Sequence, residues 1–98
     1  MSSFTTRVEL HNATYSDYET LHSAMQAEGF SRVIRADDGT FYHLPTAEYD
    51  RSGELTNNQV LQSAQRAAGK TGKAFAVLVT NAISRLWVGL PIAQAAKA

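Results

Sequence analysis

Three histidines and one arginine are the residues whose chemistry best fits a proton-transfer reaction. His11, His22 and His43 each titrate at about pH 6.5 when unperturbed, so a pair of them is suited to act as general base and general acid. Arg7 lies on the same strand face as Glu9 and His11, because residues at even spacing point the same way in an extended chain. A base, an acid and a cation are what cleavage of RNA by its own 2′-hydroxyl group requires, without a metal. Each of these residues also fits an ordinary place on a solvated surface.

Five other basic residues are candidate contacts to an RNA backbone. They are Arg32, Arg35, Arg66, Lys70 and Arg85. Arg85 lies two residues before Trp87, and an aromatic ring beside an arginine is a common device for stacking an unpaired base. The helix dipole also favours cations near a helix C-terminus without any ligand, which covers Arg66 and Lys70. Trp87 likewise fits the role of a large hydrophobic residue in a small core or a dimer interface.

The composition excludes several classes of protein. The 98 residues include no cysteine, which rules out a disulfide framework and a cysteine-ligated zinc site. No glycine-rich phosphate loop and no cluster of carboxylates is evident, so we expect neither a cofactor nor a metal. The longest apolar run, residues 74–79, is far too short to span a membrane, and no signal peptide is evident. We therefore expect a cytoplasmic protein that does not bind membranes.

The net charge is zero, but the charges are unevenly distributed. All nine acidic residues lie in residues 1–54, whereas residues 55–98 contain five basic residues and no acidic one. This balance excludes a strongly basic nucleic-acid-binding arm, while it leaves room for a local basic surface.

Hydrophobic periodicity and turn signals predict six elements in the order strand, helix, strand, strand, helix, strand. The expected strands cover residues 4–11, 30–35, 40–44 and 73–80, and the expected helices cover residues 16–28 and the stretch from a capping box at 56–59 to Gly69 or Gly72. Ser16 and Glu19 form the expected capping box of the first helix. A turn at residues 37–39 joins the second strand to the third, and residues 46–53 are expected to be a polar connection.

This order is typical of the α+β ferredoxin-like fold, βαββαβ, in which two helices cover one face of a four-stranded antiparallel sheet. Right-handed crossovers then give the strand order 4-1-3-2. We expect a single domain over residues 1–90, with a short fifth strand over residues 85–88. An alanine-rich C-terminal tail is expected over residues 91–98.

The strand over residues 73–80 lies at an edge of this predicted sheet, yet both of its faces are apolar. Phe75, Val77 and Val79 share one face, and the residues between them are alanine and leucine. A half-solvated edge strand normally alternates polar and apolar residues. The strand at 85–88, the same strand of a second copy, or the tail folding back within the chain would cover it. We expect a two-fold homodimer.

Several segments share a pattern with one known family. The strongest is LHSAMQAEGFS at residues 21–31, where Leu-basic-Ser-x-Met leads into Phe-Ser. The alternating strand at 6–10, the aspartate-containing hairpin, LPTAEY at 44–49 and KAFAVLVT at 73–80 also fit. On these segments the chain resembles the GhoS family, small cytoplasmic antitoxins of type V toxin–antitoxin systems, and that family's relatives of unassigned function.

This resemblance implies an activity. Members of the family are described as sequence-selective endoribonucleases that cleave the messenger RNA of a cognate membrane toxin. Their fold is similar to that of small CRISPR-associated spacer-acquisition nucleases, which are homodimers and in which an aspartate tied to metal ends the first strand. His11 stands at that position here, so we expect cleavage without metal. His22 stands where the family pattern has a basic helix residue, which makes it a candidate phosphate contact.

Two functions therefore compete. The first is a homodimeric, metal-independent endoribonuclease antitoxin in which Arg7, His11, His22 and His43 act on RNA. The second is a non-enzymatic homodimeric binding or regulatory protein. The zero net charge favours the second, because nucleic-acid-binding proteins usually carry an excess of basic residues.

Overall fold

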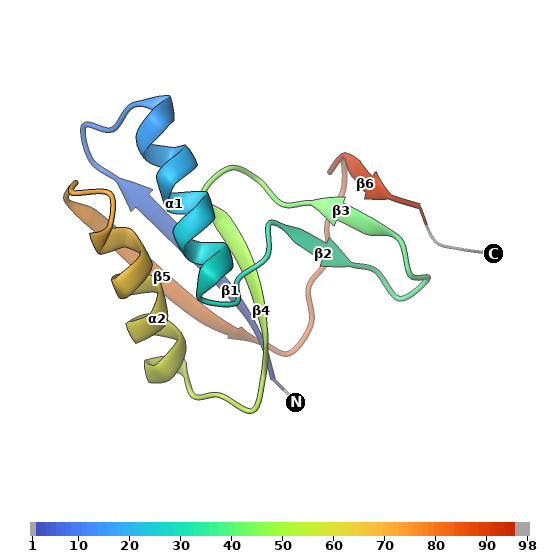
Figure 1. Ribbon diagram of the computed structural model, residues 1–98. Coiled ribbons are helices and arrows are strands. Elements are labelled where there is room, and N and C mark those ends of the chain that lie inside the picture. The colour runs from blue at the N-terminus through green and yellow to red at the C-terminus, as the bar shows by residue number, and fades with distance from the viewer. Residues whose placement is uncertain (1, 96–98) are drawn as a thin grey trace.

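The computed structural model describes residues 2–95, which form two helices and two three-stranded antiparallel sheets (Figure 1). The elements are β1 (Ser2–Leu10), α1 (Tyr15–Ala27), β2 (Val33–Arg35), β3 (Phe41–His43), β4 (Glu48–Gly53), α2 (Asn57–Gly69), β5 (Phe75–Ala82) and β6 (Ile92–Gln94). The predicted α+β class is confirmed. The predicted single four-stranded sheet in the order 4-1-3-2 is wrong, because the strands divide between a main sheet, β4-β1-β5, and a second sheet, β2-β3-β6.

The long strand β1 is the centre of the main sheet. It pairs antiparallel with β5 along almost its whole length and with β4 on its other side. Figure 1 shows α1 and α2 over the same face of this sheet. The alternation of β1 agrees with its sequence, because Phe4, Thr6, Val8 and Leu10 are buried whereas Arg7 is exposed. In the predicted order 4-1-3-2 the first strand lies beside the strand at residues 73–80, and the pairing of β1 with β5 confirms this part of the prediction.

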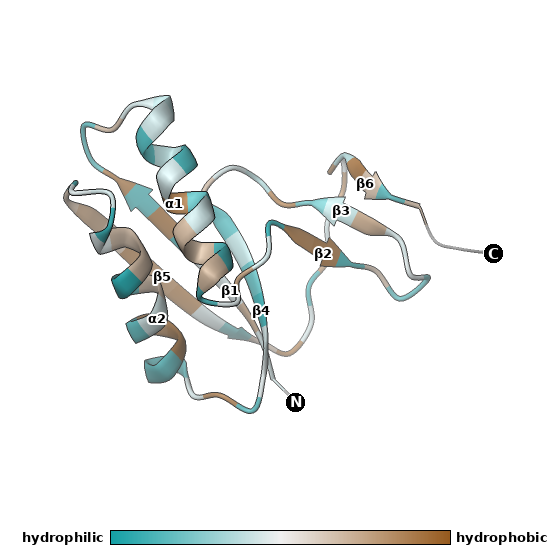
Figure 2. Cartoon of the chain, in the orientation of Figure 1, coloured by the Kyte–Doolittle hydropathy of each residue, from teal (hydrophilic) through white to brown (hydrophobic). Residues whose placement is uncertain are grey.

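The remaining strand of the main sheet lies where the sequence predicts a polar connection. β4 pairs with β1 in the place expected for the strand at 40–44. Tyr49 is the only fully buried residue of β4, and its other residues are polar or glycine, so the strand carries almost no apolar signal. Figure 2 shows this difference, because β4 is coloured mainly hydrophilic while β5 is mainly hydrophobic. A strand at the edge of a sheet, solvated on one face, needs few apolar residues.

The second sheet begins where the chain leaves the main one. Ser31 forms a single antiparallel bridge to Asp50 of β4, and β2 then diverges. The expected fourth strand of the main sheet is thus reduced to one bridge. β2 and β3 form the predicted hairpin, and Gly39 in its turn has a φ of 89°, which glycine adopts without strain.

The third strand of the second sheet, β6, lies within the expected C-terminal tail. It pairs with β3, whereas residues 85–88, where a fifth strand is expected, do not form a strand. Residues 96–98 of the expected tail lie outside the described residues. Residues 83–91 therefore cross from the main sheet to the second sheet.

Capping boxes begin both helices. α2 begins at the predicted box, in which Thr56 Oγ1 accepts from the Gln59 N–H at 3.1 Å and Gln59 Oε1 accepts from the Thr56 N–H at 2.9 Å. The box predicted for α1 is wrong. Thr14 and Asp17 form it in place of Ser16 and Glu19, and Asp17 Oδ2 accepts from the Thr14 N–H at 2.9 Å. Glu19 is therefore not a capping residue.

The hydrophobic core lies between the helices and the main sheet. Its buried residues are Phe4, Val8, Leu10, Leu21, Ala24, Met25, Phe30, Tyr49, Val60, Ala64, Ala67 and Ala68. Complete burial of one of the larger aliphatic or aromatic side chains stabilises the fold by about 1.5–3 kcal/mol. Tyr49 also carries a hydroxyl group into this core, where it needs a partner.

Candidate functional site

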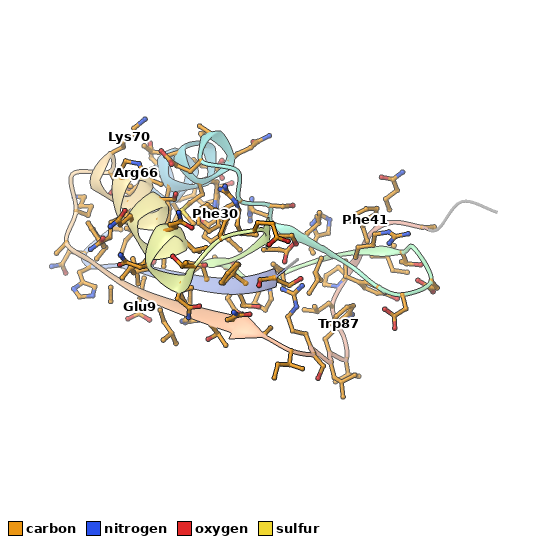
Figure 3. The ribbon with its side chains drawn as sticks, turned by 90° about the horizontal axis from the view of Figure 1, so that it is seen from below. Glu9, Phe30, Phe41, Arg66, Lys70 and Trp87 are labelled. Carbon is orange, nitrogen blue, oxygen red and sulfur yellow. The ribbon has the colours of Figure 1, made fainter. Side chains whose placement is uncertain are left out.

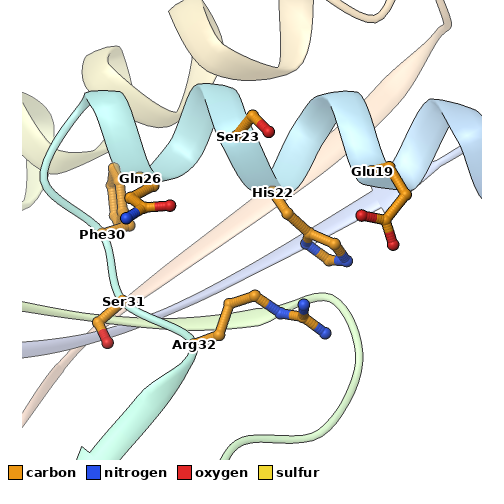
Figure 4. A pocket seen from close by; sticks show the side chains of 7 residues that line it. All are labelled: Glu19, His22, Ser23, Gln26, Phe30, Ser31 and Arg32. Carbon is orange, nitrogen blue, oxygen red and sulfur yellow. The ribbon is translucent and has the colours of Figure 1, made fainter.

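A pocket of about 440 Å³ lies between α1 and the chain that leaves it toward β2 (Figure 4). It is lined by Glu19, His22, Ser23, Gln26, Phe30, Ser31 and Arg32. The four helix residues stand at positions i, i+3, i+4 and i+7, so they share one face of α1. Leu21 and Met25, on another face of the helix, are fully buried in the core. Packing of the apolar face therefore turns the polar face toward the pocket.

A buried tyrosine orients His22. The Nδ1 atom of His22 lies 2.6 Å from the Oη atom of Tyr49, which is fully buried in β4. Burial raises the pKa of Tyr49, so its phenol keeps its proton and must donate it. Among the described residues, the acceptor for this proton is the Nδ1 atom of His22. The neutral imidazole therefore carries its own proton on Nε2, where it acts as a donor.

The charge beside His22 comes from Arg32. Burial lowers the pKa of His22, the Arg32 guanidinium lowers it further, and Glu19 opposes both effects. Figure 4 shows the Arg32 side chain extended beneath His22, and Glu19 on α1 about one turn before His22. Within residues 2–95 no carboxylate forms an ion pair with Arg32. The pocket thus combines a neutral imidazole, an unneutralised guanidinium and a carboxylate.

The other predicted catalytic residues lie on different surfaces. Arg7 is on the sheet face away from the helices, with ion pairs of 3.6 Å to Glu9 and 3.5 Å to Glu48. His11 is exposed just beyond the end of β1, and His43 is exposed on β3 of the second sheet. The structure does not bring these residues together with His22.

The predicted RNA-binding residues are also dispersed. Arg66 forms an ion pair of 3.0 Å with Glu28, and Lys70 is the exposed C-cap of α2 (Figure 3). Arg35 is exposed on β2. Among these predicted residues, Arg32 alone lines the pocket that contains His22.

The side chain of Arg85 is hydrogen-bonded to residues of the main sheet. Its Nη1 atom donates to Asp50 Oδ1 at 2.8 Å and to Thr5 Oγ1 at 3.1 Å. These hydrogen bonds attach residues 83–91, the crossing segment, to the main sheet. A smaller pocket of about 280 Å³ has Arg35, Tyr42, Arg85 and Trp87 among its lining residues. The Trp87 ring packs edge-on against Tyr42, with 5.5 Å between centroids. Stacking of a base on Trp87 remains a prediction beside its structural role.

The sequence pattern did not identify Glu19, which lines the pocket, or Tyr49, which contacts the pocket residue His22. Tyr49 lies within residues 46–53, where the sequence predicts a polar connection, and Glu19 lies where it predicts a capping box. Tyr49 is the only apolar residue of β4, so no alternation of apolar and polar residues indicates a strand there.

No family model matches the sequence, and no curated protein matches it significantly. Neither helix is long and apolar enough, in the part of the chain that the structure describes, to cross a membrane. Within residues 2–95, histidine and acidic side chains do not gather in groups of three or more that could hold a metal ion.

Proposed function

We propose that this protein is a metal-independent endoribonuclease that acts at the pocket of Glu19, His22 and Arg32, as an antitoxin of the GhoS-like kind. The observation that carries the proposal is that His22 and Arg32, selected separately from the sequence, line one pocket. Their hydrogen-bonding and electrostatic state also suits phosphate binding. We further propose that it acts in the cytoplasm, as a homodimer, on single-stranded RNA.

The side chains have distinct roles in this reaction. Arg32 and the Nε2–H group of His22 donate hydrogen bonds to the non-bridging oxygens of the phosphate, where negative charge grows as the reaction proceeds. Glu19 accepts the proton of the 2′-hydroxyl group, whose oxygen forms a bond to phosphorus. The P–O5′ bond breaks, and a proton from water passes to the 5′-oxygen. The products are a 2′,3′-cyclic phosphate and a 5′-hydroxyl end.

The remaining lining residues suit an unpaired nucleotide. Ser23, Gln26 and Ser31 provide hydroxyl and amide groups that can bond a base or ribose, and Phe30 contributes an apolar wall. The pocket volume of about 440 Å³ lies within the usual range for sites that bind small ligands. Because these groups suit contacts to an unpaired base, the pocket is better suited to a single strand than to a duplex.

A cleavage assay tests this proposal. Labelled single-stranded RNA is incubated with the pure protein in excess EDTA, beside the same sequence with 2′-deoxyribose at every position. We expect the RNA to be cut to 2′,3′-cyclic phosphate ends and the DNA to stay intact, because the nucleophile is the 2′-hydroxyl group. Absence of cleavage of every RNA tried, or cleavage that EDTA abolishes, contradicts the proposal.

The role of Glu19 has its own matched pair of variants. Glu19→Gln should lower the cleavage rate by about 10²–10⁴-fold, the usual contribution of a positioned base. Glu9→Gln changes the same chemical group on the opposite side of the main sheet and should leave the rate within about twofold. Equal rates for the two variants contradict the assignment of Glu19 as base.

A second candidate function is a non-enzymatic homodimeric binding protein. One observation favours it: Arg7, Arg66, Lys73 and Arg85 each have a carboxylate partner within the chain. These pairs neutralise four of the nine basic residues, which weakens the attraction for a long RNA backbone. A protein that binds no RNA at low salt, yet is dimeric, supports this second candidate.

A further inference from the structure

The strand β5 is a long edge strand without the usual protection against pairing. Its sequence is FAVLVTNA, it pairs with β1 on one side, and no second strand within residues 2–95 pairs with its other side. Natural edge strands commonly carry charges, proline or a bulge that prevents pairing with another chain. β5 contains no charged residue and no proline, and its register with β1 is continuous.

Two hydrogen bonds identify the backbone groups of β5 that face outward. The His11 N–H donates to the Ala74 carbonyl at 2.9 Å, so the backbone of Ala74 faces β1. The Val8 N–H donates away from β5, to the Ala47 carbonyl at 2.9 Å, so its register partner Val77 faces outward. Backbone direction alternates along an antiparallel strand. The outward-facing N–H and C=O groups are therefore those of Phe75, Val77, Val79 and Asn81.

The groove beside this edge is lined by uncharged residues. A groove of about 360 Å³ runs between α2 and β5, lined by Asn57, Asn58, Leu61, Val77, Leu78 and Val79. The side chain of Leu78 is 64% exposed. About a two-fold axis the same surface of both copies meets, so a surface with charges of one sign would repel its copy, whereas an uncharged groove does not.

We propose that the edge of β5 binds β5 of a second copy, antiparallel, about a two-fold axis at Leu78. This pairing gives the homodimer of the proposed function its geometry, and it rests on that part of the proposal. Phe75 of one copy lies opposite Asn81 of the other, and the two main sheets join in the order β4-β1-β5-β5-β1-β4. The two Leu78 residues form a non-hydrogen-bonded pair, in which side chains lie closest.

Cysteine cross-linking tests this geometry, because the natural chain has no cysteine. Leu78→Cys places two thiols opposite each other at the axis, within disulfide range. Thr80→Cys is the matched control, because it also lies on an exposed position of β5, while its two copies are offset by roughly 13 Å. In mild oxidant we expect Leu78→Cys to form a covalent dimer of twice the 10.7 kDa chain mass, at least about tenfold faster than Thr80→Cys. Equal rates for the two variants overturn the proposal.

A second pair of variants removes only the outward hydrogen bond. Val79→Pro deletes an outward-facing N–H, whereas Val79→Ala shortens the same side chain and keeps the donor. Light scattering after size exclusion should find dimers for the wild type and for Val79→Ala, and monomers for Val79→Pro with an unchanged circular dichroism spectrum. Monomeric wild type at about 100 μM, or a Val79→Pro variant as dimeric as Val79→Ala, overturns the proposal.

These measurements contain no RNA, so they separate the interface from the catalytic proposal. A dimeric protein that cross-links at Leu78 and cuts no RNA supports the interface and contradicts the nuclease. An active protein that stays monomeric contradicts the interface and the homodimer, and it leaves the nuclease proposal in place.

Discussion

The main sheet and the second sheet of this protein are held together by different forces. β1 buries four side chains beneath two helices, whereas all three residues of β6 are exposed. The strands of the second sheet bury one side chain, that of Ile34, and the sheet depends otherwise on backbone hydrogen bonds, on the contact of Trp87 with Tyr42 and on the hydrogen bond from Arg85 to Asp50. Local stability follows buried apolar contact, so the second sheet should open at a lower free energy than the main sheet.

This difference matters for the pocket because the pocket lies at the junction of the two regions. His22 and Tyr49 belong to the well-packed body, which holds the imidazole in one orientation. Arg32 lies just before β2, in the segment through which the chain leaves this body for the second sheet. The imidazole is therefore fixed, while the position of the guanidinium depends on the weaker region.

The largest expected effect compares the two regions directly. Phe4→Ala, in the centre of the main sheet, should lower the free energy of unfolding by about 3–5 kcal/mol. Ile92 in β6 is 61% exposed, and Ile92→Ala should change that free energy by less than about 0.5 kcal/mol. Urea denaturation followed by circular dichroism measures both. Similar losses for the two variants contradict the comparison.

Arg85→Ala should affect the second sheet alone. The arginine side chain is 23% exposed, and removing its hydrogen bonds to Asp50 and Thr5 should destabilise the crossing segment by about 1 kcal/mol. Amide hydrogen exchange should then speed up in β3 and β6 and stay unchanged in β1. A uniform increase across both sheets, or none in either, argues against two regions of different stability.

Tyr49→Phe tests how the main body orients His22. The ring stays in the core while its hydroxyl is lost, at about 0.5–1.5 kcal/mol of stability. The lost hydrogen bond favours neutral imidazole, so its removal should raise the pKa of His22 toward the ordinary histidine value, as measured by NMR titration. Tyr42→Phe, in the second sheet, should leave that pKa unchanged. A lower pKa of His22 in Tyr49→Phe is incompatible with Tyr49 as the donor.

The smallest effect is a pH dependence of stability. Because the pKa of His22 is lowered in the folded chain, the unfolded chain takes up this proton first as the pH falls. The stabilisation is therefore complete above about pH 6.5 and is lost as the pH falls through the folded pKa. Urea denaturation should show that wild type loses more stability than His22→Gln between about pH 7 and 5. A stability difference that stays constant with pH contradicts a lowered pKa.

The fold was predictable where the pattern is local. The alternation of β1, the capping box of α2 and the hairpin of β2 and β3 each follow from neighbouring residues. The predicted sheet was wrong because β4 was not recognised as a strand. Its polar residues are accommodated by one solvated face and by ion pairs with Arg7 of β1 and with Arg85. Those partners lie far away in the sequence, so no pattern of neighbouring residues predicts them.

The site was predictable only in part, for a similar reason. Residue types selected His22 and Arg32, but they also selected His11, His43 and Arg7, which lie on other surfaces. Which histidine gains an arginine neighbour depends on the chain leaving the main sheet after Ser31, a tertiary event. Tyr49 could be recognised as its partner only once β4 was known to lie beneath α1.

The most direct test of the central claim compares two histidine variants in one assay. Initial rates of single-stranded RNA cleavage in EDTA are measured for wild type, His22→Ala and His43→Ala, with folding checked by circular dichroism. We predict a loss of at least about 10²-fold for His22→Ala, since it removes a donor to the transition-state charge, and a change within about twofold for His43→Ala. A His22→Ala variant as active as wild type, or an equal loss in His43→Ala, would contradict the account.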